Sequence, residues 1–135
     1  MKKYENYASA LATLAKAPEQ DLDNEFVLSG IIDKFSLQFE LGWKLLKAVL
    51  AYEGQTVAAT GSPRDIIKAS YALFDFLDED LWLSMLRDRN TTTHVYGEAK
   101  ERELVSAIIE RYLPAFQQLK TGLDKRYGGW LMAED

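Results

Sequence analysis

The 135-residue sequence contains no cysteine and a single histidine, at position 94. The lack of cysteine excludes disulfides and thiolate metal ligands, and it fits a reducing environment. A zinc site needs several histidine, cysteine or acidic ligands, so a metal site is not expected here. No apolar run approaches the roughly 20 residues that span a bilayer, and the first residues lack the hydrophobic segment of a signal peptide. We therefore expect a cytoplasmic protein with no metal ion and no membrane partner.

Basic residues are in the minority. Lysine and arginine number 16 against 21 aspartates and glutamates, which gives a net charge of −5 and a pI near 4.9. A general nucleic-acid-binding protein normally has a basic face that attracts phosphates, so this balance argues against one. Contact with RNA would have to be local or be supplied by a partner, and a basic partner suits the charge.

The motifs that hold common cofactors are absent as well. There is no Walker A loop, no G-x-G-x-x-G fingerprint and no nucleophile elbow, so we expect no cofactor. Gly61-Ser62 and Asp78-Glu79-Asp80 are similar to parts of a nucleotidyltransferase signature. That signature belongs on a β-sheet, whereas both segments stand where helices are predicted to begin, and helix capping explains them better. The chain is therefore not predicted to be a transferase itself.

Hydrophobic residues recur with helical spacing along the chain, without the alternation that is typical of strands. Helices are expected over residues 2–16, 24–53, from 62 onward, 79–90 and 98–123. Because the connections are short, neighbouring helices should be antiparallel. The predicted fold class is all-α, an up-and-down antiparallel bundle of four or five helices. We expect one domain over residues 1–127 and a flexible tail over residues 128–135.

Local signals mark the ends of the expected helices. Asp23 or Asn24 is a candidate N-cap of the second helix, and Gly54 is placed to end it. Ser62, followed by proline and an acidic first turn, is a strong start signal for the third helix. Asp78 should cap the fourth, and Pro114 should kink the fifth.

The second expected helix is apolar on two sides. One stripe comprises Leu28, Ile31, Ile32, Phe35 and Phe39, and a second begins at Leu37 and comprises Leu41, Leu45, Val49 and Tyr52. A helix that is apolar on two sides is usually buried on two sides. We expect one side to pack in the bundle and the other against a second protomer or a partner. On the same helix, Glu40 and Lys44 have the spacing of a solvated i,i+4 ion pair.

The segment Arg89-Asn90-Thr91-Thr92-Thr93-His94-Val95-Tyr96 holds the only histidine and joins two expected helices. Consecutive threonines are β-branched and compete for backbone hydrogen bonds, so a straight helix is disfavoured there. In an unbroken helix, side chains five positions apart point about 140° away from each other. A break across the threonines would let Arg89, His94 and Tyr96 converge on one pocket.

These residue types suit metal-independent cleavage of RNA. The reaction needs a base, an acid and positive charge at the phosphate, which histidine and arginine supply. Because one protomer has a single histidine, the two proton transfers require a homodimer that brings two copies of Arg89 and His94 into one cleft. The structural alternative is that Arg89 and His94 complement the helix dipole and cap the helix end, and that Tyr96 is a half-buried aromatic residue.

Several segments carry a family resemblance. Arg89-Asn90-Thr91-Thr92-Thr93-His94 resembles the R-x4-H motif of the HEPN superfamily, including the polar residue after the arginine. His94-Val95-Tyr96 resembles the H-x-Y extension of HEPN proteins that are encoded beside minimal nucleotidyltransferases. Two further segments carry the same resemblance: Phe39-Glu40-Leu41-Gly42-Trp43-Lys44 and Ser62-Pro63-Arg64. Over residues 4 to 125 the chain resembles the nucleotidyltransferase substrate-binding protein family, a close relative of the HepT toxins.

The resemblance implies a helical bundle that forms a homodimer and binds a cognate minimal nucleotidyltransferase, within a heterotetramer or a similar assembly, as a toxin–antitoxin-like pair. It implies that Arg89 and His94 are catalytic residues of a metal-independent RNase, supported by Asn90. It also implies that the transferase AMPylates Tyr96, which puts a bulky anion two residues from His94 and silences the activity. Two other interpretations stay open: a non-catalytic substrate-binding subunit, and a structural helical adaptor.

Overall fold

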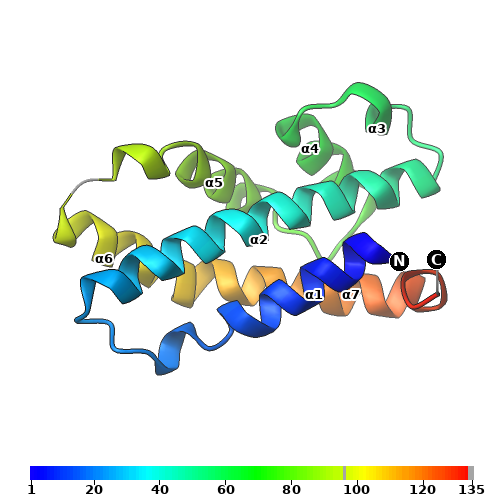
Figure 1. Cartoon of the computed structure of the whole chain (residues 1–135). Coiled ribbons are helices and arrows are strands. Elements are labelled where there is room, and N and C mark those ends of the chain that lie inside the picture. Colours follow the sequence, from blue (N-terminus) through cyan, green and yellow to red (C-terminus); the bar gives the residue numbers. More distant parts are fainter. Residues whose placement is uncertain (96, 134–135) are drawn as a thin grey trace.

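The computed structural model describes residues 1–95 and 97–133 of the chain, and no strand occurs among them. The predicted all-α class is confirmed (Figure 1). In chain order the elements are α1 (Lys2–Leu14), η1 (Ala17–Glu19), α2 (Glu25–Tyr52), α3 (Val57–Thr60), α4 (Pro63–Leu73), α5 (Glu79–Asn90), η2 (Thr92–His94), α6 (Glu98–Ala107), η3 (Ile108–Tyr112) and α7 (Leu113–Leu131). Within the described ranges, no helix is both long and apolar enough to cross a bilayer.

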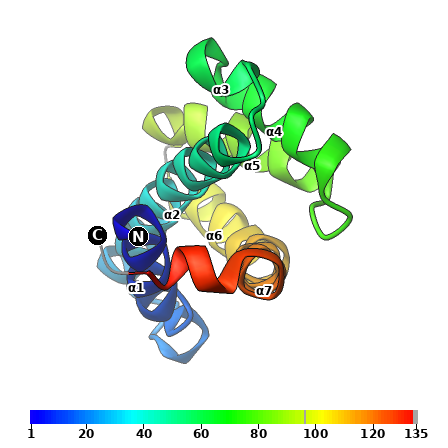
Figure 2. The same ribbon diagram turned by 90° about the vertical axis from the view of Figure 1, so that its right-hand side faces the viewer.

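The long helix α2 lies at the centre of the bundle and contacts α1, α3, α4, α5 and α6. In Figure 1, α1 and α5 run in one direction, while α2 and the α6–α7 segment run in the other. The end-on view of Figure 2 places α1 and α7 on one side of α2 and α3, α4 and α5 on the other. The arrangement is therefore an up-and-down bundle around α2, with α7 packed against α1.

The predicted capping residues hold the helix ends. Asn24 is the N-cap of α2, where its side chain accepts hydrogen bonds from the backbone N–H groups of Phe26 and Val27. Ser62 and Asp65 form a reciprocal capping box at the start of α4. Gly54 follows α2 with a φ of 76°, a left-handed conformation that glycine adopts at low cost. These starts and stops follow from local backbone chemistry, which is why the sequence predicts them.

Aromatic side chains fill the core where the helices cross α2. Phe35 of α2 stacks on Tyr112 with ring centres 5.3 Å apart, and Trp82 of α5 meets Phe116 of α7 edge-on at 5.6 Å. Tyr7 is fully buried, and its hydroxyl donates a hydrogen bond of 2.7 Å to the Phe116 carbonyl. These contacts join α1, α2, α5 and α7 into one core. Because such a core is close-packed, a substitution that disturbs one of these contacts also disturbs the packing of α5.

The last part of the chain departs from the prediction in two ways. A π-helical stretch, Ile108–Tyr112, precedes Pro114, and the kink falls at Tyr127. Proline cannot donate a backbone hydrogen bond and its ring crowds the preceding turn, so a wider turn ahead of it relieves the strain. The helix also continues past the expected end at residue 123 to Leu131, because Leu131 is buried and Trp130 stacks on Tyr52 at 4.1 Å.

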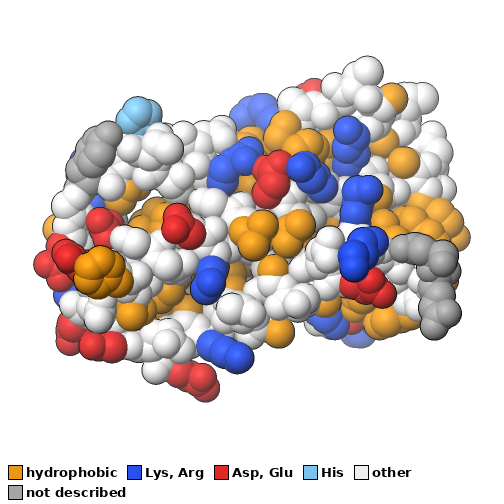
Figure 3. All heavy atoms as spheres, viewed as in Figure 1, with side chains coloured by type: hydrophobic (Ala, Val, Ile, Leu, Met, Phe, Trp, Pro, Cys, Tyr) orange, Lys and Arg blue, Asp and Glu red, His pale blue; other side chains and the backbone are white. Residues whose placement is uncertain are grey.

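The second apolar stripe of α2 is only partly covered within one chain. Leu45 and Val49 are buried, but Leu37 is 52% exposed and Tyr52 is 57% exposed. Figure 3 accordingly shows hydrophobic side chains at the surface along the face that α2 crosses. That a second protomer or a partner covers the exposed part stays a prediction.

Gly42 is the point of closest approach between α2 and its neighbours. A Cβ atom there would lie 3.1 Å from the Trp82 ring and 3.2 Å from the Tyr7 ring, whereas one at Gly30 of the same helix would meet nothing within 4 Å. We expect Gly42→Leu to destabilise the protein by about 1–3 kcal/mol through overpacking. Gly30→Leu is the matched control and should be neutral or stabilising by a few tenths to about 1 kcal/mol. Urea unfolding measures both, and equal effects at the two positions would contradict this account of the α2–α5 contact.

Candidate functional site

The helix that carries the arginine ends where the threonines begin. The Asp78 side chain accepts a hydrogen bond from the Leu81 N–H at the start of α5, and the helix stops at Asn90. The Thr91 hydroxyl donates to the carbonyls of Arg87 and Asp88 at 3.2 Å, and the Thr92 hydroxyl donates to the Arg89 carbonyl at 3.0 Å. Threonine side chains thus satisfy the free carbonyls of the last turn. The predicted break in the helix is confirmed, and the chain continues after it as the short 3₁₀ turn Thr92–His94.

Arg89 is held against the middle of α2. Its Nη1 lies 2.7 Å from Oε2 of Glu40, and its guanidinium carbon lies 5.3 Å from the centre of the Phe39 ring. The side chain is 27% exposed, and its Nε atom is buried with no hydrogen-bond partner among the described residues. Two consecutive residues of α2 therefore determine the direction of this arginine: one by charge and one by its aromatic face.

Glu40, for which the sequence predicted only the pair with Lys44, is the residue that holds Arg89. The expected ion pair with Lys44 is present at 3.2 Å, but the Trp43 Nε1–H also donates to Glu40 at 3.0 Å, to the oxygen that binds Arg89. Burial opposes ionisation of Glu40, yet the hydrogen bonds from Trp43 and Lys44 and the charge of Arg89 outweigh it, so the pKa is below its ordinary value of 4.5. The sequence pattern from Phe39 to Lys44 contains no signal for the contact with Arg89, because Glu40 and Arg89 are 49 positions apart.

The other predicted site residues lie at the surface. His94 ends the 3₁₀ turn and is exposed, as is Asn90 at the end of α5. Figure 3 shows the chain's single histidine, in pale blue, at the edge of the molecule. Tyr96 lies outside the described residues, so the convergence of Arg89, His94 and Tyr96 on one pocket stays a prediction.

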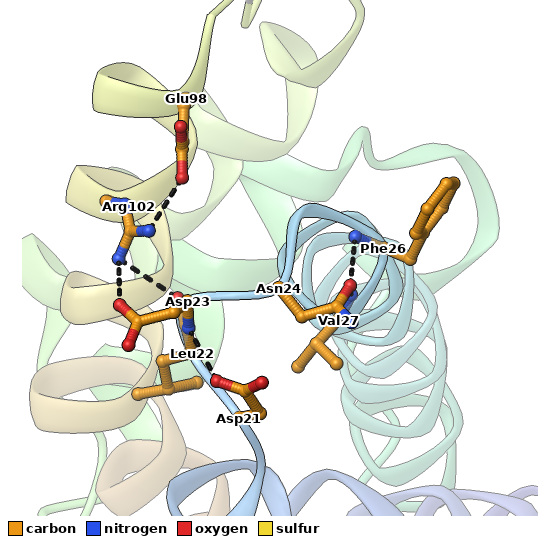
Figure 4. A network of polar contacts seen from close by, with 8 residues as sticks. All are labelled: Asp21, Leu22, Asp23, Asn24, Phe26, Val27, Glu98 and Arg102. Atoms are coloured by element: carbon orange, nitrogen blue, oxygen red, sulfur yellow. Dashed lines mark hydrogen bonds and ion pairs between the residues drawn. The ribbon is translucent and has the colours of Figure 1, made fainter.

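The segment after the turn is fixed by Arg102 of α6 (Figure 4). Its Nη1 donates to the Leu22 carbonyl and to Asp23, both at 3.1 Å, and its Nη2 lies 2.6 Å from the Glu98 carboxylate. Asp23, which was considered as a helix cap, therefore pairs with α6 and leaves the capping to Asn24. The start of α6 is thereby tied to the loop before α2, so both ends of the turn that carries His94 are anchored to α2 or its approach.

In residues 1–95 and 97–133, no group of three or more His, Cys, Asp or Glu side chains is arranged to hold a metal ion.

The lowered pKa of Glu40 predicts a pH dependence of stability. The ionised carboxylate stabilises the folded state, so its contribution is fully present above pH 4.5 and is lost as the pH falls through the lowered folded-state pKa. Glu40→Gln removes the charge and should cost about 1 kcal/mol at pH 7. The variant should also lose less stability than the wild type between about pH 5 and pH 3.

Urea unfolding at several pH values measures this effect, with the exposed Glu110→Gln as control. Parallel pH profiles for the wild type and Glu40→Gln would contradict the ion pair with Arg89.

Comparison with known proteins identifies a family for the chain. A search of curated proteins finds no match to this chain. The profile of a protein family described as "Nucleotidyltransferase substrate binding protein like" matches residues 2–125, which include Glu40, Arg89 and His94. That match covers most of the chain, from α1 into α7. The protein therefore belongs to the nucleotidyltransferase substrate binding protein-like family.

Proposed function

We propose that this protein is the HEPN-type partner subunit of a minimal nucleotidyltransferase and that its homodimer carries a metal-independent ribonuclease centre. The family name supports the partnership with a nucleotidyltransferase. One observation supports the catalytic part: Arg89 is held in a fixed direction beside a helix break that leaves His94 exposed. A preorganised cation and an accessible imidazole are two groups that phosphodiester cleavage needs.

The chemistry assigns a separate role to each residue. In the dimer, one His94 accepts the proton of the attacking 2′-hydroxyl and the other protonates the leaving oxygen. Each Arg89 uses Nη1 for Glu40 in its described contacts, which leaves Nη2 for a phosphate oxygen. Asn90, exposed at the end of the same helix, supports substrate binding as a neutral hydrogen-bond donor.

The surface beside Glu40 supports a dimer. Leu37, one turn earlier on α2, is 52% exposed, and Leu41 is half-buried. An apolar strip next to a charged, functional residue is suited to a two-fold contact, because the same patch on both protomers is self-complementary. Such a contact brings the α5 ends of the two protomers together with their Arg89 and His94 side chains.

The proposed silencing acts through charge and size. In the toxin–antitoxin-like pair, the transferase attaches AMP to the Tyr96 hydroxyl, two residues from His94. The added phosphodiester carries a negative charge that competes with RNA phosphate for Arg89, and the nucleoside fills the approach to the imidazole.

A first prediction concerns RNA cleavage. The purified protein should cleave single-stranded RNA without added metal, and His94→Ala should reduce the rate by at least about 100-fold through loss of a general acid or base. Thr93→Ala, its exposed neighbour, is the matched control and should keep the activity. Gel analysis of labelled RNA measures both. Cleavage that is equally fast in His94→Ala would exclude His94 from the reaction.

A second candidate function is a non-catalytic subunit that binds the transferase's substrate. The observation that favours it is the Glu40–Arg89 ion pair itself, because Glu40 neutralises the cation within one chain. The net charge of −5 also favours it over an RNA-binding enzyme. The same RNA assay distinguishes the two, since this candidate requires that wild-type protein leave RNA intact.

A second prediction concerns the modification. Incubated with the cognate transferase and labelled ATP, the wild type should incorporate AMP, and Tyr96→Phe should lose the incorporation because it lacks the acceptor hydroxyl. Tyr71→Phe is the matched control, since Tyr71 is 52% exposed and far from the motif in sequence. If Tyr96→Phe accepts as much AMP as Tyr71→Phe, the assigned acceptor is wrong, and the structural-adaptor interpretation gains support.

A further inference from the structure

A second basic region lies beside the same helix end. A cleft of about 380 Å³ forms where the end of α5 meets α6 and η3, and Arg87, Lys100 and Arg111 line it. Leu104 and Ala107 of α6 provide an apolar wall. Its volume falls within the range of about 300–1,000 Å³ that is common for small-molecule sites. Arg89, by contrast, is held at Glu40 and Phe39 of α2.

Among the described residues, local carboxylates pair with only one of the three cations that line this cleft. Asp88 is engaged by the Tyr112 hydroxyl and by Arg87, whose Nε lies 3.5 Å away. Neither Lys100 nor Arg111 forms an ion pair with any carboxylate of the described residues, although Glu103 also lines the cleft. Lys100 and Arg111 therefore present two cations without ion pairs in the described part of the chain on one concave surface, which is suited to an anionic ligand.

The π-helical stretch builds one wall of the cleft. It contains Arg111 and Tyr112, and such stretches frequently occur at functional sites. The Tyr112 ring is buried against Phe35, and its hydroxyl donates to Asp88. Burial and the contact with Asp88 raise the Tyr112 pKa, so the hydroxyl stays protonated and keeps Asp88 engaged. The guanidinium of Arg111 lies 5.3 Å from the Tyr112 ring centre, which leaves its donors free to face the cleft.

We infer that this cleft binds the phosphate group of a nucleotide, with Arg111 and Lys100 contacting the phosphate oxygens and the Leu104–Ala107 wall contacting the nucleoside. A guanidinium grips phosphate oxygens in a bidentate way, and an ammonium adds a point charge. The phosphate belongs either to a free nucleotide or to an RNA chain, and both present the same group. Thr91 and Val95 line the cleft but Arg89 and His94 do not, and the inference does not depend on ribonuclease activity.

Isothermal titration calorimetry at low salt tests the inference, with ATP, AMP, adenosine and a single-stranded RNA hexamer as probes. ATP should bind more tightly than AMP, and adenosine, which lacks phosphate, should not bind. The double variant Lys100→Ala/Arg111→Ala should weaken binding at least about tenfold. Lys2→Ala/Arg64→Ala removes two exposed cations from α1 and α4 and is the control for net charge.

The outcomes show whether the cleft binds phosphate and whether that phosphate belongs to a nucleotide or to RNA. Binding of ATP that Lys100→Ala/Arg111→Ala weakens identifies a nucleotide site in the cleft, and binding of the hexamer alone that the same variant weakens identifies an RNA phosphate site there. Failure of every phosphate probe to bind, or equal weakening in the two double variants, overturns the inference. Lys100 and Arg111 are both exposed, so thermal unfolding should match that of the wild type and show that the variant is folded. His94→Ala should keep nucleotide binding, so this test is independent of the ribonuclease proposal.

Discussion

The ion pair between Glu40 and Arg89 is the interaction on which the arrangement of the site depends. It joins the middle of α2 to the last turn of α5 across 49 positions of sequence. The pair is partly buried, and Trp43 and Lys44 also hold the carboxylate. Removal of either partner would leave the other charge without its ion pair, at a cost of about 1 kcal/mol. The direction of Arg89 is thus a property of α2 as much as of α5.

Close packing gives that ion pair its geometry. Gly42, two residues after Glu40, lets the Trp82 ring approach the α2 backbone, and Trp82 lies two helical turns before Arg89. The two contacts define the separation and the rotation of α5 relative to α2. The 3₁₀ turn then begins from a fixed point, and Arg102 holds the start of α6 on the other side. His94 is thus exposed on a short turn between α5, which contacts α2, and α6, which contacts the loop before α2.

The end of α5 presents two chemically different sides. Arg87 and Arg89 are two residues apart, so their side chains point about 200° from each other around the helix. Arg89 contacts α2 and belongs to the candidate ribonuclease centre, while Arg87 lines the basic cleft beside α6 and η3. Each is paired with a carboxylate, Arg87 with Asp88 and Arg89 with Glu40.

The sequence by itself determined the local structure. Hydrogen bonds within a few residues decide where a helix begins and ends, so Asn24, Ser62, Asp78 and the threonine break could be predicted from their neighbours alone. Contacts between distant residues depend on how the helices pack, and no local pattern encodes them. The Glu40–Arg89 pair, the basic cleft and the extension of α7 to Leu131, where Trp130 stacks on Tyr52, were therefore decided only by the tertiary structure.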